Sequence, residues 1–237
     1  MLESVLFWVM FPVLAGIAGG VATALRPPGP GMTSAVQHFA AGVVFAAAAG
    51  EILPDMLDGG RVAPVVVGFS AGVVLMLCLA AWERRVDARG VQGFPGAALV
   101  AIGIDLVIDG FLIGMGFLAG EKQGLLLTFA LTLEVLFLGL SVAALLAGAG
   151  IGRAGIMGIT TGLIFLTPLG AMVAVAASSF FQGPVLVAGL SFGCAALLYL
   201  VTEELLVEAH ETAPDTSFRA GMFYLGFLIV IVLEIGS

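Results

Sequence analysis

Residues 96–119 read GAALVAIGIDLVIDGFLIGMGFLA, an apolar stretch with two carboxylates, Asp105 and Asp109, near its middle. It is long enough for a membrane-spanning helix, which needs about 20 mainly apolar residues. A carboxylate at the centre of a bilayer costs roughly 2.5–3.5 kcal/mol on insertion scales. Because burying these two acids in a membrane is so unfavourable, their presence predicts a functional site inside the membrane helix.

The rest of the chain is equally apolar. Of its 237 residues, 61% are hydrophobic and only 10% are charged, with a mean hydropathy of +1.19. This leaves too little charge to cover a soluble protein of this length. We expect an all-α integral membrane protein, a single polytopic domain over residues 1–237 with eight transmembrane helices. These are expected at residues 4–25, 34–56, 62–82, 96–119, 125–149, 155–178, 184–209 and 217–236.

Charge indicates the partners and the orientation. The net charge of −8 argues against nucleic-acid binding, which requires a basic face. The N-terminal segment MLESVLFWVM has no basic region, so we interpret it as a first membrane helix and not as a signal peptide. Six of the eight basic residues fall in odd-numbered loops, which places those loops in the cytoplasm and both termini outside. The expected location is the plasma (inner) membrane.

Short segments of the two halves resemble each other. Glu51-Ile-Leu-Pro-Asp55 ends the second expected helix, and Glu204-Leu-Leu-Val-Glu208 lies in the seventh, which runs in the opposite direction. Phe11–Gly16 in the first helix pairs in the same way with Thr167–Gly170 in the sixth. We predict that helices 1–3 and 6–8 form an inverted repeat around central helices 4 and 5.

A third deep carboxylate, Glu134, lies in the fifth expected helix. Asp105 and Asp109 are four residues apart and share one helix face. At 1.5 Å per residue, Asp105 and Glu134 each lie ~14 Å from a helix end, near the middle of the bilayer. No lysine or arginine lies in these helices. We predict that the three acids converge on a cation from outside; the alternative is protonated acids that donate hydrogen bonds to neighbouring helices.

Further polar residues mark the two ends of a cation path. We expect Glu51 and Asp55 at the outer mouth, and Glu203, Glu204, Glu208 and His210 at the inner mouth. Acids at helix ends also reach water without any function, so each mouth alone is ambiguous. Pro168 interrupts the sixth helix. This break either exposes backbone oxygen to a metal, with the Thr167 hydroxyl beside it, or is only a packing kink. His38 is expected to be an interfacial side chain.

Several of these segments resemble the ZIP family of divalent-metal transporters, in particular its GufA-like prokaryotic branch. Residues 198–210, LYLVTEELLVEAH, resemble the family signature LYVVSxExIPESH. Residues 167–170 resemble E-P-[LV]-G, and residues 51–55 are similar to HLLPE. The resemblance implies an elevator-type carrier, often a homodimer, in which helices 1, 4, 5 and 6 move against helices 2, 3, 7 and 8.

The departures from the family fall on its metal site. In the fourth helix, Asp105 takes the place of the family histidine and Leu106 that of its asparagine, while Asp109 is retained. In the fifth helix, Glu134 stands for a histidine, and Val135 and Leu138 replace two glutamates. The expected transport site is then a single ion held by the three carboxylates, with Thr167. Imidazole suits Zn²⁺ and all-oxygen sites suit Mn²⁺, Mg²⁺ or Ca²⁺, so the metal (Zn, Mn or Fe) stays open.

We expect a transporter and not an enzyme, because the sequence has no HExxH motif and no Ser/His or Cys/His pair. No cofactor is expected beyond the transported divalent metal. Two alternatives remain. One is a transport-inactive metal-sensing or partner subunit on the same scaffold, and the other is a proton or other-cation carrier that uses the same acids.

Overall fold

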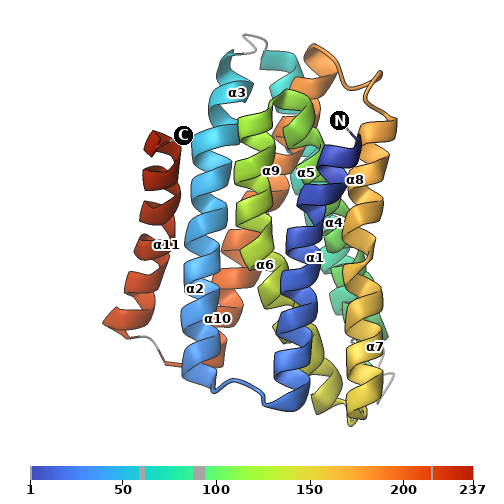
Figure 1. Cartoon of the computed structure of the whole chain (residues 1–237), viewed down its shortest axis with the longest axis vertical. Helices are drawn as coiled ribbons and strands as arrows, with labels where there is room; N and C mark the ends of the chain where they lie inside the picture. The colour runs from blue at the N-terminus through green and yellow to red at the C-terminus, as the bar shows by residue number, and fades with distance from the viewer. Residues whose placement is uncertain (1, 59–61, 88–93, 215, 237) are drawn as a thin grey trace.

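The computed structural model describes residues 2–58, 62–87, 94–214 and 216–236, which form helices and no strand. Eight continuous helical stretches in these ranges are long and apolar enough to cross a membrane. They stand side by side in one bundle. The first helix begins and the last helix ends at the same end of this bundle (Figure 1). The prediction of an all-α multi-pass membrane protein with eight spans is confirmed.

The spans are made of thirteen helical elements. In chain order these are α1 (Leu2–Leu25), α2 (Pro30–Ala47), η1 (Ala48–Ile52), α3 (Leu53–Asp58), α4 (Val62–Asp87), α5 (Gly96–Ala119), α6 (Glu121–Gly148), α7 (Arg153–Ile164), α8 (Leu166–Ala176), α9 (Pro184–Tyr199), η2 (Leu200–Leu205), α10 (Leu206–Thr212) and α11 (Ser217–Gly236). The expected fourth and eighth helices have the bounds of α5 and α11. The others differ from their predictions by a few residues.

Three spans are not uniform α-helices, which the sequence reasoning anticipated only for the sixth. That span breaks at Phe165, between α7 and α8 and three residues before Pro168. The second and seventh each contain a π-helical segment, η1 and η2. Pro54 follows η1 and has no N–H for the Gly50 carbonyl, so a wider turn re-pairs the backbone there.

The packing has the symmetry that an inverted repeat predicts. The most extensive contacts pair α1 with α6, α5 with α8, α2 with α11, and α4 with α9. Exchanging the first span with the sixth, the second with the seventh, the third with the eighth and the fourth with the fifth turns these pairs into one another. The two π-helices also correspond, because η1 contains Glu51 and η2 contains Glu204, the matching glutamates of the two segments.

Glycines allow the tightest of these contacts. A Cβ added at Gly110 of α5 would run into the Thr167 carbonyl of α8, and one at Gly170 would meet the Val107 carbonyl. In the symmetry-related pair, a Cβ at Gly139 of α6 would meet the Gly16 carbonyl of α1. Small residues let membrane helices approach until their backbones touch. These contacts fix α5 and α6, which carry the three acids, within the bundle.

Candidate metal centre

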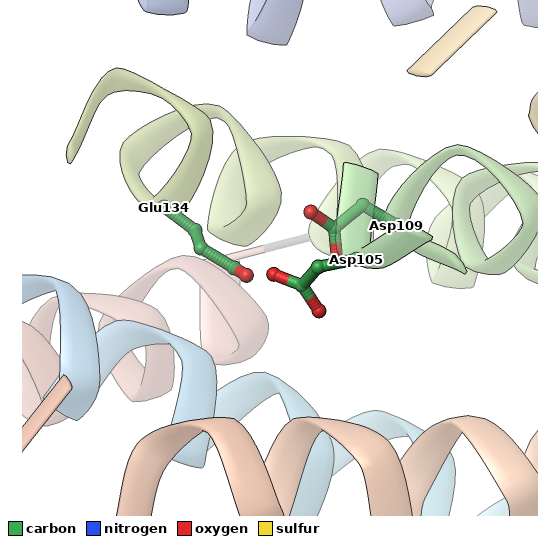
Figure 2. Close-up of side chains that lie close together, drawn as sticks. All are labelled: Asp105, Asp109 and Glu134. Atoms are coloured by element: carbon green, nitrogen blue, oxygen red, sulfur yellow. The ribbon is translucent and has the colours of Figure 1, made fainter. Parts of the chain in front are cut away.

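The three deep carboxylates meet between α5 and α6. Figure 2 shows Glu134 of α6 pointing toward Asp105 and Asp109, which project from consecutive turns of α5. One carboxylate oxygen from each residue lies within 4.8 Å of the others. Oxygens that share one divalent cation lie at most about 4–5 Å apart, given bond lengths of about 2.0–2.6 Å. The predicted convergence of the three acids is therefore present, at a spacing that suits a single ion.

The short connection between the two helices sets this arrangement. α5 ends at Ala119 and α6 begins at Glu121, so only Gly120 separates the two antiparallel helices. With so short a turn, residues equally far from Gly120 lie at equal depth. Asp105 and Glu134 are fifteen and fourteen residues from it. The four-residue spacing within α5 then brings Asp109 to the same side of the helix as Asp105.

The site is buried and poor in hydrogen-bond partners. Asp105, Asp109 and Glu134 are 7%, 2% and 0% exposed. In the described part of the chain, neither carboxylate oxygen of Glu134 has a hydrogen-bond partner, and nor does the Oδ2 atom of either aspartate. Buried polar atoms of this kind are rare in folded proteins unless a bound water or ion completes their hydrogen bonds. A bound cation would satisfy all of these oxygens at once.

Electrostatics point the same way. Two unit charges about 4–5 Å apart repel by roughly 3–4 kcal/mol even at an effective dielectric constant of 20. Three ionised carboxylates at this spacing therefore need a counter-charge, which is either protons or a cation. A divalent cation neutralises two of the three charges and is coordinated at the same time. The geometry is compatible with a cation-binding centre that has oxygen ligands only.

Thr167 lies beside this centre. It is fully buried in the first turn of α8, and its Oγ1 has no hydrogen-bond partner in the described structure. Its carbonyl faces Gly110, the residue after Asp109. The helix break at Phe165 lies two residues before it, and Pro168 leaves the Ile164 carbonyl without its usual donor. Thr167 therefore belongs to the helix segment that packs against the residue next to Asp109.

An acidic cavity leads away from the centre. It has a volume of about 330 Å³ and reaches from Asp105 past Glu204 to Glu208. We call this cavity the vestibule. Of the predicted inner-mouth residues, Glu203, Glu204 and Glu208 line it. α10 carries Glu208 and lies toward one end of the bundle. The start of α1 and the end of α11 lie at the opposite end of the bundle (Figure 1).

The vestibule contains polar residues that the sequence reasoning did not single out. Glu83, Arg84 and Tyr199 belong to its lining. Ser141 of α6 also lines it and donates a hydrogen bond of 3.2 Å to Glu208 Oε1. Ser141 is seven residues, or about two turns, beyond Glu134. That spacing on one helix face would have identified it.

The predicted outer mouth is only partly described. The backbones of Glu51 and Asp55 belong to η1 and α3, but their side chains lie outside the described part of the structure. Glu234 of α11 lies next to this region. A Cβ added at Gly50 would be 2.9 Å from Glu234 Oε2, so this carboxylate faces the π-helix that contains Glu51. Gly50 and Glu234 are far apart in the sequence, so no local pattern predicted this contact.

The two histidines lie apart from the vestibule lining. His210, predicted for the inner mouth, contacts His38 of α2, with ring centroids 5.1 Å apart. The expectation that His38 is an interfacial side chain is wrong, because His38 is only 3% exposed. The α10 helix packs along α2 and covers it. The sequence places His38 near the start of a helix, and no local pattern predicted that α10 would pack over it.

No protein-family model matches the sequence, and no curated protein matches it. The function of the chain therefore has to be inferred from the site itself.

Proposed function

We propose that the chain is a ZIP-like carrier that moves a divalent metal cation across the membrane, toward the cytoplasm, through the three-carboxylate centre. The observation that carries this proposal is that Asp105 belongs both to the buried acid cluster and to the lining of the vestibule. A cation at the cluster thus has a polar route to one end of the bundle. In the proposed orientation, that end faces the cytoplasm.

The division of the bundle into two packing groups supports an elevator-type movement. α1 and α5–α8 pack mainly with one another, as do α2, α4 and α9–α11. These groups correspond to the two sets of spans that move against each other in the ZIP family. Asp105, Asp109 and Glu134 all belong to the first group, so the centre would move as one unit.

The ligand set favours a hard cation. Carboxylate and hydroxyl oxygens suit Mn²⁺, whereas imidazole and thiolate are the usual ligands of Zn²⁺. No histidine or cysteine is part of the cluster. Among Zn²⁺, Fe²⁺ and Mn²⁺, we expect Mn²⁺ to be the cargo that fits the site best.

Uptake into proteoliposomes tests the proposal. Vesicles that contain the purified protein and an internal metal-sensitive dye are expected to take up Mn²⁺, Fe²⁺ or Zn²⁺. The double variant Asp105→Asn/Asp109→Asn is expected to reduce uptake to the level of protein-free vesicles, because one carboxylate cannot hold a divalent ion in competition with water. The double variant Glu3→Gln/Glu121→Gln removes the same charge from exposed positions and serves as the control.

Three outcomes would contradict the carrier. Uptake that survives in the Asp105→Asn/Asp109→Asn variant would exclude the centre as the transport site. Metal binding without uptake would instead support the transport-inactive sensor. Uptake driven by a pH gradient without any divalent metal would support a proton or other-cation carrier.

The acids of the vestibule are expected to accelerate cation entry. Charged clefts raise association rates by about 10–10³-fold. In the double variant Glu204→Gln/Glu208→Gln, we expect the association rate of Co²⁺, followed by stopped-flow absorbance, to fall at least about tenfold at low salt. The difference should shrink at high salt, where charges are screened. Equal rates in this variant and in Glu3→Gln/Glu121→Gln would show that the vestibule is not the route.

A further inference from the structure

The chain has only two histidines, and they touch. His38 lies on α2 and His210 on α10, at opposite ends of the sequence, yet their ring centroids are 5.1 Å apart and their planes are inclined by 62°. Ser34 fixes the two helices at this level, because its hydroxyl donates a hydrogen bond of 2.8 Å to the Ala209 carbonyl. The pair therefore sits at a tight contact between two helices.

Both rings are held in the same way. Nδ1 of His38 lies 2.8 Å from the carbonyl oxygen of Ser34, and Nδ1 of His210 is hydrogen-bonded to the carbonyl oxygen of Leu206. A carbonyl only accepts, so Nδ1 carries the proton in each ring and the lone pair of the neutral imidazole is on Nε2. Histidines that bind metals typically donate their other ring nitrogen to a carbonyl or a carboxylate in this manner.

The spacing of the rings also fits a metal. Two imidazoles bound through nitrogen to one tetrahedral ion, at about 2.0–2.1 Å, have centroids roughly 5 Å apart. His38 is 3% exposed and His210 lies at an exposed position, so the pair is closed on the α2 side and open to water on the α10 side. Water can complete the coordination there.

We propose that His38 and His210 form a second metal site, which takes a borderline divalent transition metal such as Zn²⁺, Cu²⁺ or Ni²⁺. Imidazole nitrogen prefers these ions, whereas the three-carboxylate centre offers oxygen only. The site is separate from that centre and does not depend on the transport proposed above. Because α10 also carries Glu208 of the vestibule, an ion at this site would fasten α2 to a helix of the cation route.

Binding of Cu²⁺ to the full chain tests the site. The protein is purified with a tag that contains no histidine, and its central acids are replaced (Asp105→Asn, Asp109→Asn, Glu134→Gln) so that any signal is independent of the first centre. With one equivalent of Cu²⁺, pulsed electron paramagnetic resonance is expected to show two bound imidazoles, each with a protonated remote nitrogen. Since the chain has two histidines, these signals have only one source.

Single substitutions then decide the matter. His210→Gln, at an exposed position, and His38→Gln are each expected to leave at most one imidazole signal and to weaken Cu²⁺ binding at least about tenfold, since even outer-shell partners of metal ligands cost that much. Glu211→Gln, beside His210, is the control and should keep both signals. Spectra without imidazole nitrogen in the parent protein, or identical spectra in His210→Gln, would show an aromatic contact only and overturn the proposal.

Discussion

Replacing Glu134 with glutamine is expected to weaken divalent-cation binding by at least about 100-fold. Loss of an outer-shell partner already costs metal sites 10–100-fold, and Glu134 supplies a carboxylate directly to the cluster. The variant should fold as well as the parent protein or better. Neither oxygen of Glu134 has a hydrogen-bond partner in the described structure, so the substitution removes no hydrogen bond. The variant also no longer has to bury a carboxylate when it folds.

Calorimetric titration of the purified protein with Mn²⁺ measures the first effect, and thermal unfolding in detergent measures the second. Glu121→Gln is a matched control, since it makes the same chemical change at an exposed position in the first turn of the same helix. Wild-type affinity in Glu134→Gln would remove this residue from the ligand set. A large loss of stability without metal would indicate instead that the side chain has a structural role.

Adding a single methyl group at Gly110 is expected to destabilise the bundle and to disturb the metal centre together. In Gly110→Ala, the new Cβ would collide with the Thr167 carbonyl, which is backbone and cannot rotate away. Overpacking of this kind typically costs about 1–3 kcal/mol. To relieve it, α5 and α8 must move apart, and Asp109 precedes the collision directly. We therefore expect a lower unfolding temperature and weaker Mn²⁺ binding in the same variant.

Gly158→Ala provides the comparison. Gly158 is also a helical glycine, on α7, but nothing lies within 4 Å of a Cβ added there. Because alanine favours helix by about 1 kcal/mol over glycine, this variant should unfold at the same or a higher temperature. If Gly110→Ala behaved like Gly158→Ala, the close approach of α5 and α8 would not be present in the folded protein.

The central site was predictable because its signal is local. Apolar stretches of known length give the number and depth of the helices, and a four-residue spacing gives the shared face of Asp105 and Asp109. Glu134 could be placed with them because the short connection around Gly120 makes the two helices antiparallel neighbours. Hydropathy and spacing along one helix, or across one tight turn, were sufficient.

The contacts that escaped prediction join elements far apart in the chain. His38 and His210, and likewise Gly50 and Glu234, come together through packing of whole helices, which no local pattern encodes. The π-helix at η2 has no proline to announce it. Pro54 follows the other π-helix, η1, but this link became clear only when the structure showed where the backbone hydrogen bonds change from α-helical to π-helical.

The correspondence between η1 and η2 has a consequence for how the bundle alternates. In the proposed carrier, the vestibule runs beside η2 to Asp105, and an inverted repeat would give it a counterpart that runs beside η1 to Glu134. If the halves exchanged conformations, the first passage would narrow as the second widened. An ion coordinated by all three carboxylates would then face the other compartment without ever leaving its ligands.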